Sequence, residues 1–236
     1  MLKLYYICPE LGNLYGDRFN LTVLASALAE VGIETETVEW RRSDPEPDLP
    51  DAALVYFGPV TEHRLEIMLD AVRPFADKLR AEAEGGLPML FTGAAAELAV
   101  EEIVKTDGTV IPALGIVKGR AVRRENRRVG DYLGDMDGRR VAGFVNCQSQ
   151  VEEGEFPAFE TVFGIPEKTE GILKGNLLAT YLTGPVLVRN PWLRRELAER
   201  ILKRIAPNAE MPTWSEDSSD RGYEVTVNEL KKRMQK

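Results

Sequence analysis

The sequence predicts an α/β fold: a mostly parallel sheet with helices on both of its faces. Up to Thr106, short apolar runs alternate with longer segments in which apolar residues recur at helical spacing. Loops containing glycine and proline separate these segments. Strands that alternate with helices form parallel sheets, and right-handed crossovers place the helices on both faces.

The first half supplies the parallel strands and their helices. We expect strands at residues 2–8, 33–39, 52–57 and 87–91, and helices from about residue 18 to Gly32, at 61–83 and at 94–104. Leu21, Leu24 and Leu28 illustrate the helical spacing. Pro74 lies within the second helix and is expected to kink it, because its ring removes a backbone donor.

The second half predicts antiparallel additions to the sheet. Short strand-like runs at 114–122, 128–133, 139–145 and 159–163 are separated by glycine or aspartate turns. A buried strand is expected at 176–182, followed by a helix at 192–205 that Pro191 introduces. We therefore predict one domain over residues 1–206 and a polar C-terminal tail over 207–236, with a short helix at 225–234.

Composition excludes several classes of function. The net charge of -8 argues against a nucleic-acid partner, because binding phosphates requires a basic surface. No apolar run approaches the length of a membrane span, and the N-terminus lacks the pattern of a signal peptide. The two cysteines form no disulfide framework, which fits the cytoplasm. The one histidine, His63, excludes His-rich zinc sites, and we expect neither a metal nor a cofactor.

The stretch at 87–98 is the centre of the predicted architecture. Its apolar residues predict a buried strand, and the following Gly93-Ala94-Ala95-Ala96 predicts a tight turn into a helix. Elbows of this kind present a nucleophile above the sheet in α/β enzymes of acyl transfer. The apex here is Gly93, which carries no side chain.

Four motifs in order along the chain resemble one family. They are Asn-Leu-Tyr-Gly-Asp-Arg at 13–18, Gly-Phe-Val-Asn at 143–146, Glu-Gly…Gly-Asn at 170–176 and Thr-Tyr-Leu-Thr-Gly-Pro…Asn-Pro at 180–191. They resemble class I glutamine amidotransferases of the cobyric-acid-synthase-like branch, in particular glutaminase subunits that work with a Mur-ligase-like protein. The likeness extends to about residue 204 and implies a flavodoxin-like fold.

The resemblance also implies catalytic positions that this chain has lost. In the family, a cysteine at the elbow attacks the glutamine amide, and a histidine activates the thiolate and protonates the departing ammonia. These positions correspond to Gly93 and Thr183. The family's loop after the third strand offers a backbone N–H to the oxyanion, whereas here Pro59 follows Gly58 and has no N–H.

The resemblance also implies residues of the ligand site, one of which can be matched in two ways. The resemblance implies that Arg128, Gly58, Ala94 and Asn146 line the ligand site. The arginine could equally be the adjacent Arg127, or an exposed charge at a strand end.

Asn13, Tyr15 and Asp17 form a polar loop, either facing a partner or serving as a turn with a helix cap. Glu97, at the family's glutamine position, either balances a helix dipole or enters the vacated pocket. A relocated Cys147–His63 pair is a further, disfavoured alternative, because a lone cysteine after a strand is usually a packing residue.

Three hypotheses follow for function. The favoured one is a catalytically degenerate amidotransferase-like subunit that binds a Mur-ligase-like partner or a small ligand. The second is an active glutaminase subunit that supplies ammonia for cell-wall precursors, as the resemblance alone would imply. The third is a different enzyme on the same scaffold.

Overall fold

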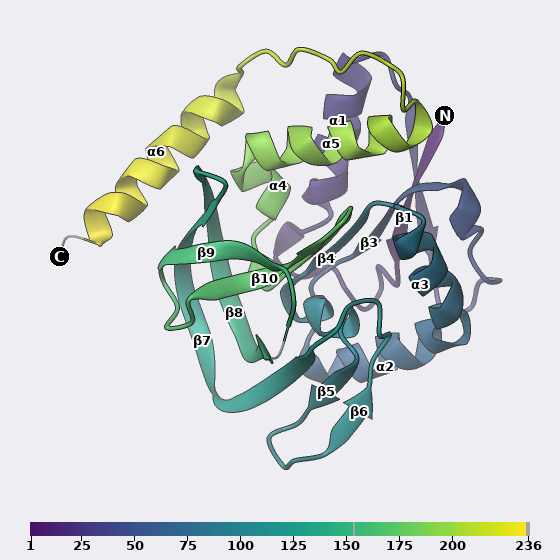
Figure 1. Ribbon diagram of the computed structural model, residues 1–236, viewed down its shortest axis with the longest axis vertical. Coiled ribbons are helices and arrows are strands. Elements are labelled where there is room, and N and C mark those ends of the chain that lie inside the picture. The colour runs from purple at the N-terminus through teal and green to yellow at the C-terminus, as the bar shows by residue number, and fades with distance from the viewer. Residues whose placement is uncertain (153, 235–236) are drawn as a thin grey trace.

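The computed structural model describes residues 1–152 and 154–234, which form a twelve-stranded mixed sheet with helices on both faces (Figure 1). The strands are β1 (Leu2–Ile7), β2 (Thr35–Trp40), β3 (Ala52–Phe57), β4 (Met89–Thr92), β5 (Glu102–Val104), β6 (Val110–Pro112), β7 (Arg120–Met136), β8 (Arg139–Glu152), β9 (Pro157–Phe163), β10 (Thr169–Lys174), β11 (Leu177–Thr180) and β12 (Leu182–Thr183). The helices are α1 (Phe19–Glu30), α2 (Glu62–Val72), α3 (Ala76–Glu84), α4 (Val186–Arg189), α5 (Pro191–Ile205) and α6 (Ser218–Arg233).

The predicted fold class is confirmed. Strands β11, β4, β3, β1 and β2 pair in parallel in that order. Helices α1, α4 and α5 lie on one side of these strands and α2 and α3 on the other (Figure 1). Every residue of β3 and β4 is buried, as expected for parallel strands covered on both faces. Phe57 of β3 stacks on Phe91 of β4, with 4.5 Å between ring centroids.

The second half of the chain adds antiparallel strands that curl back onto the parallel part. Along the sheet the order is β12, β8, β7, β9, β10 and then β11. Strand β11 pairs with β10 and β4, whereas β12 pairs with β8, and only Tyr181 separates β11 from β12. The curl brings the residues after β11 to the carboxyl end of β4, where the elbow lies.

Two helix predictions need correction. The helix expected at 61–83 is divided into α2 and α3 by a 3-10 turn at Arg73–Phe75, because Pro74 supplies no backbone donor. The prediction of a helix at 94–104 is wrong. A short 3-10 helix spans Gly93–Leu98, and β5 follows it. Backbone N–H groups of residues 113–117 donate to the carbonyls of residues 98–101, which a continuing helix would have needed for itself.

The strand predictions in the second half were too short. The runs expected at 114–122 and 128–133 give way to the single strand β7, whose pairing with β8 is irregular between Arg123 and Arg128. The strand expected at 139–145 continues as β8 to Glu152. Strand β10 was not predicted.

Helix α6 begins well before the predicted residue 225 and packs on the outer face of the antiparallel strands. Its buried residues Val227 and Leu230 contact Leu133 of β7 and Ala142 of β8. Within the part of the chain that the structure describes, no helix is long and apolar enough to cross a membrane.

Candidate functional site

The elbow after β4 holds Gly93 in a conformation that glycine accepts most readily. Its φ is +59°, in the left-handed region where other residues are strained. A Cβ built on Gly93 would lie 2.6 Å from Pro59 Cβ and 3.1 Å from Thr183 Cγ2. Both distances are shorter than ordinary carbon contacts. The space that a nucleophilic side chain would occupy is therefore filled by Pro59.

Thr183, which the resemblance matches to the family's histidine, has its hydroxyl bound to the backbone. It is buried, and its hydroxyl donates to the carbonyl oxygen of Phe144 at 3.0 Å. Its methyl group is the part that faces Gly93. A threonine hydroxyl does not titrate near neutral pH, so this side chain cannot replace an imidazole as base.

A pocket of about 250 Å³ lies over Gly93. We call its buried lining residues the floor: Pro59, Val60, Gly93, Ala94 and Thr183. We call its exposed and half-buried lining residues the rim: Leu14, Tyr15, Thr61, Glu62, Arg127 and Asn146. The floor is apolar apart from backbone groups and the Thr183 hydroxyl, whereas the rim is polar and charged apart from Leu14.

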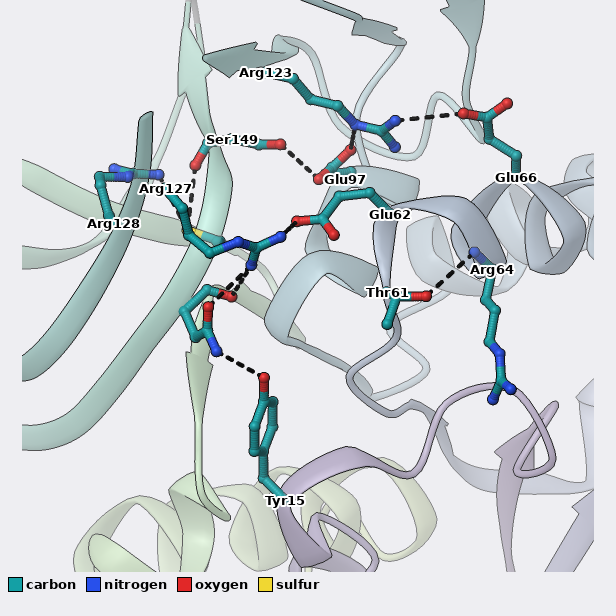
Figure 2. A network of polar contacts seen from close by, with 12 residues as sticks. Tyr15, Thr61, Glu62, Arg64, Glu66, Glu97, Arg123, Arg127, Arg128 and Ser149 are labelled. Atoms are coloured by element: carbon teal, nitrogen blue, oxygen red, sulfur yellow. Dashed lines mark hydrogen bonds and ion pairs between the residues drawn. The ribbon is translucent and has the colours of Figure 1, made fainter. Parts of the chain in front are cut away.

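A continuous chain of polar contacts crosses the rim (Figure 2). Asn146 Nδ2 donates to the Tyr15 hydroxyl at 2.8 Å. Arg127 Nη1 donates to Asn146 Oδ1 at 2.9 Å, and Arg127 Nη2 donates to Glu62 at 2.5 Å. These contacts join the first loop, β8, β7 and the start of α2. They hold a carboxylate and a guanidinium next to each other at the mouth of the pocket.

The structure brings several of the predicted ligand residues to this pocket, but not all of them. Ala94 and Asn146 line it, as do Gly93 and Thr183, which the resemblance matches to the catalytic positions. Gly58 does not line it. A Cβ at Gly58 would lie 2.3 Å from the carbonyl oxygen of Gly12, so this glycine is required for the close approach of two loops.

Arg128 also lies outside this pocket, and its neighbour Arg127 is the arginine on the rim. Successive residues of a strand point to opposite faces, so only one of the two can reach the elbow. Arg128 instead pairs with Glu167, with 2.8 Å between Nη1 and Oε2, and its Nη2 lies 3.2 Å from Cys147 Sγ. It lines a separate cavity together with Glu170 and Tyr181.

The loop predicted to face a partner divides into exposed and buried residues. Asn13 is exposed, and Tyr15 is 50% exposed with its hydroxyl on the pocket rim. Asp17 is fully buried, so the prediction that it faces a partner is wrong. Its carboxylate accepts hydrogen bonds from Asn20 Nδ2 at 3.0 Å, Tyr56 OH at 2.8 Å and Thr92 Oγ1 at 2.6 Å.

Asp17 is thus an interior acid that ties the first loop to α1, β3 and β4. Burial raises its pKa to about 6, although its hydrogen bonds oppose the rise. No pattern in the sequence indicates this role, since an aspartate before a helix is ordinarily a cap.

Glu97 is buried behind the elbow and does not enter the pocket. Its carboxylate accepts from Arg123 Nε at 3.0 Å and from Ser149 Oγ at 2.6 Å. Arg123 also pairs with Glu66, which in turn pairs with Lys105. Burial raises the pKa of Glu97, while Arg123 and Ser149 favour its ionised form. Neither predicted role fits, because Glu97 instead binds Arg123 and Ser149 and so ties the 3-10 helix after the elbow to β7 and β8 (Figure 2).

The relocated nucleophile is not supported. Cys147 is fully buried, and burial raises the pKa of its thiol to about 12, so the thiolate is scarce at neutral pH. Its thiol donates to the Ser149 carbonyl, and Arg128 Nη2 contacts its sulfur. His63 lies at the start of α2 and lines none of the pockets described above. Among the residues that the structure describes, no group of three His, Cys, Asp or Glu side chains could hold a metal ion.

Comparison with solved structures defines the class of protein to which this fold corresponds. A glutamine amidotransferase structure superposes with a TM-score of 0.58 at 18% identity, covering 85% of this chain and 99% of that one. The glutaminase domain of Trypanosoma brucei CTPS with bound acivicin gives a TM-score of 0.54 at 11% identity, covering 92% and 98%. A Thermotoga maritima glutamine amidotransferase gives 0.51 at 13% identity, covering 97% and 94%. The chain therefore has the fold of class I glutamine amidotransferases.

The sequence comparison identifies a particular relative. The chain is 24% identical over 208 residues to subunit GatD of the glutamine-hydrolyzing lipid II isoglutaminyl synthase of Staphylococcus aureus (strain N315), covering 86% of this chain and 85% of GatD. No protein-family model matches the chain. The resemblance predicted from the four motifs is thus confirmed.

Proposed function

We propose that this chain is a catalytically inactive, amidotransferase-like subunit that binds a Mur-ligase-like partner in cell-wall precursor metabolism. The contact between Pro59 and Gly93 is the observation that carries the proposal. If the chain had lost only the nucleophilic side chain, the space for that side chain would remain open. Here the 2.6 Å approach of Pro59 to the Cβ position leaves none.

Two further features support inactivity. Thr183 cannot act as a base, and its hydroxyl is already used by Phe144. Pro59 has no N–H for an oxyanion, and one such donor contributes roughly 3 kcal/mol in hydrolases. Nucleophile, base and one of the oxyanion donors are therefore missing together, and without them an amide carbon is too poor an electrophile to be attacked.

The partner is inferred from the resemblance. GatD is by its name a subunit of a synthase, and this chain resembles it over most of its length. The exposed residues Asn13 and Tyr15, beside the pocket, are the surface that we assign to the partner. Cytoplasmic localisation belongs to the same proposal and is supported by two cysteines that are free and buried.

One experiment tests both parts of the proposal. The chain is co-expressed with a Mur-ligase-like protein from the same genome, and the purified complex is incubated with acivicin, an electrophilic glutamine analogue. We expect a complex of the two proteins by size-exclusion chromatography and no mass adduct on this chain, whereas an active glutaminase treated in parallel gains one. Failure to form a complex would contradict the proposed Mur-ligase-like partner. An adduct on this chain would contradict the proposed catalytic inactivity.

The same complex locates the partner surface. Tyr15→Ala is expected to weaken the complex, because it removes a half-exposed aromatic ring beside the pocket. Val225→Ala is the matched control, since Val225 is an exposed apolar residue on α6. Equal effects of the two substitutions would remove Tyr15 from the interface.

A further inference from the structure

We propose that two copies of this chain associate through the free edge of β2, so that the sheet continues across a two-fold axis. The inference goes beyond the proposed function, because β2 lies at one end of the sheet and lines no part of the pocket over Gly93. The exposed backbone of this edge, its lack of protection and its self-complementary register carry the inference.

The backbone of β2 has hydrogen-bonding groups that no neighbour uses. Cys8 N–H donates to the carbonyl oxygen of Trp40 at 2.8 Å, so the even-numbered residues of β2 face β1. The N–H and C=O groups of Thr35, Thr37 and Glu39 therefore point away from β1. Since β2 is the last strand of the sheet, no other described strand or loop bonds these groups.

The edge of β2 also lacks the features that ordinarily protect a free edge. Strand β12, at the opposite end of the sheet, has two residues, and β6 has three and ends in Pro112. Strand β2 has six residues without a proline, and it pairs with β1 without a bulge. Short strands, prolines and bulges keep open edges from pairing with other chains. The β2 edge is therefore open to a further strand.

The outward residues define one antiparallel register between two copies. A two-fold axis at Thr37 pairs Thr37 with its own copy and Thr35 with Glu39 of the second copy. Each facing pair exchanges two hydrogen bonds, so about six cross the interface. An axis at Glu36 or at Glu39 would place that glutamate against its own copy, and like charges that face each other destabilise a sheet. Only the axis at Thr37 pairs all three outward residues with one another and avoids such a contact.

The same register brings opposite charges toward each other. Glu34 and Glu36 are exposed at the start of β2. Arg41 and Arg42 follow its end, and their side chains are 49% and 48% exposed although each pairs with a glutamate of its own chain. Antiparallel pairing places the start of one β2 beside the end of the other, so glutamates of each copy approach arginines of the second. A second copy of the chain therefore complements this edge in charge as well as in hydrogen bonding.

The test is sedimentation velocity of the purified chain alone, at concentrations between about 1 μM and 1 mM. We expect a monomer that passes into a dimer as the concentration rises, because a single pair of strands makes a small interface. A chain that stays monomeric over this range would overturn the inference and leave the edge to a strand of another protein. Assemblies that grow beyond the dimer would overturn the closed two-fold arrangement.

Thr37→Pro tests the pairing of the two backbones. Proline removes the N–H at the axis in both copies, and because this N–H points away from β1, the fold should be retained. We expect the dissociation constant of the dimer to rise by about tenfold or more. Thr37→Val keeps the N–H and suits a strand, so this matched control should leave the dimer nearly unchanged. Equal weakening by both substitutions would contradict pairing through the backbone.

Disulfide trapping tests the register without a proline. Across the proposed axis, residue 36 lies opposite residue 38 of the second copy, with about 4.5 Å between Cα atoms, a distance that a disulfide can span. Glu36→Cys and Val38→Cys chains are mixed and oxidised with glutathione disulfide, and we expect a linked dimer whose mass contains one of each. Either variant alone should link far less, because identical positions are about 7–8 Å apart on the diagonal. Linking in the mixture that does not exceed that of the single variants would contradict the register.

The native cysteines do not confuse this measurement, because Cys8 and Cys147 are both buried. The outcome is also separable from that of the proposed function. If the chain is monomeric but forms the complex with the ligase-like protein and gains no acivicin adduct, this inference fails and the proposed function stands. If an adduct forms on this chain, the proposed inactivity fails whatever the sedimentation shows.

Discussion

At Gly93, the absence of a side chain and the close packing of Pro59 depend on each other. The positive φ of +59° makes any larger residue costly, and Pro59 makes it costlier still. Reintroducing a cysteine would therefore require a change at Pro59 as well as at Gly93. The site that we propose to be inactive is therefore closely packed at Gly93 and not merely empty.

This coupling predicts the stability of alanine variants. Gly93→Ala is expected to lower the free energy of unfolding by about 2 kcal/mol more than Gly175→Ala. Gly175 has nearly the same φ, +58°, but nothing lies within 4 Å of its Cβ position, so it reports the backbone cost alone. Urea denaturation measures both. In a Pro59→Gly background the extra cost should become smaller, with the remainder due to Thr183 Cγ2, and an extra cost that is unchanged there would show that the Pro59 side chain is not its source.

Asp17 predicts an unusual dependence of stability on pH. Its pKa is raised from 3.8 to about 6 by burial, so the native state holds this proton to a higher pH than the unfolded state does. The contribution of Asp17 to stability is therefore complete below pH 4 and is lost as the pH rises through 6, by about 3 kcal/mol. An ion-paired carboxylate shows the opposite pH dependence, because its pKa is lowered and its contribution to stability is lost as the pH falls.

The comparison of wild type with Asp17→Asn isolates that contribution. The variant cannot ionise, so its free energy of unfolding should improve relative to wild type by about 2 kcal/mol between pH 4.5 and pH 7.5. Asp70→Asn is the control, because Asp70 is exposed on α2. A difference between wild type and Asp17→Asn that stays constant with pH would show that the aspartate is already ionised at pH 4.5.

Among the secondary-structure elements, α6 shows how charges fix a helix that buries little apolar surface. Only Val227 and Leu230 of α6 are buried. Its first turn is held by Arg195, whose Nη1 and Nη2 each lie 2.7 Å from an Asp220 carboxylate oxygen. This bidentate pair is 13% and 18% exposed, so it is screened less than a surface pair.

Arg195→Ala is therefore expected to loosen α6 selectively. Hydrogen exchange of residues 218–233 should become about tenfold faster or more, with little change in β3 and β4. Lys232→Ala is the matched control, since it removes an exposed ion pair within the helix itself. Exchange that accelerates equally throughout the chain would contradict local docking.

The secondary-structure elements that could be predicted are those with a regular local pattern in the sequence. The buried strands and amphipathic helices of the first half follow from their periodicity, and Pro74 correctly marked an interruption. The helix predicted after Gly93 failed because residues 113–117, distant in sequence, take its carbonyl groups. Local pattern carries no information about such a competitor.

For the molecule as a whole, the motifs predicted the fold and which residues meet at the elbow. They did not predict which side chains are buried or which reach the pocket. Gly93 and Thr183 meet at the elbow because β11 pairs with β4 and β12 with β8. That Asp17 is buried, and that Arg127 and not Arg128 reaches the pocket, depends on packing and on strand register. Neither is visible in the residue types.

The proposed inactivity means that this chain, despite its amidotransferase fold, does not hydrolyse glutamine. The most direct measurement is ammonia released from L-glutamine by the purified chain, alone and in complex with its ligase-like partner. We predict release equal to a buffer blank in both cases, because Gly93 supplies no nucleophile, Thr183 no base and Pro59 no oxyanion donor. Release above the blank that rises with the concentration of the chain would contradict the account.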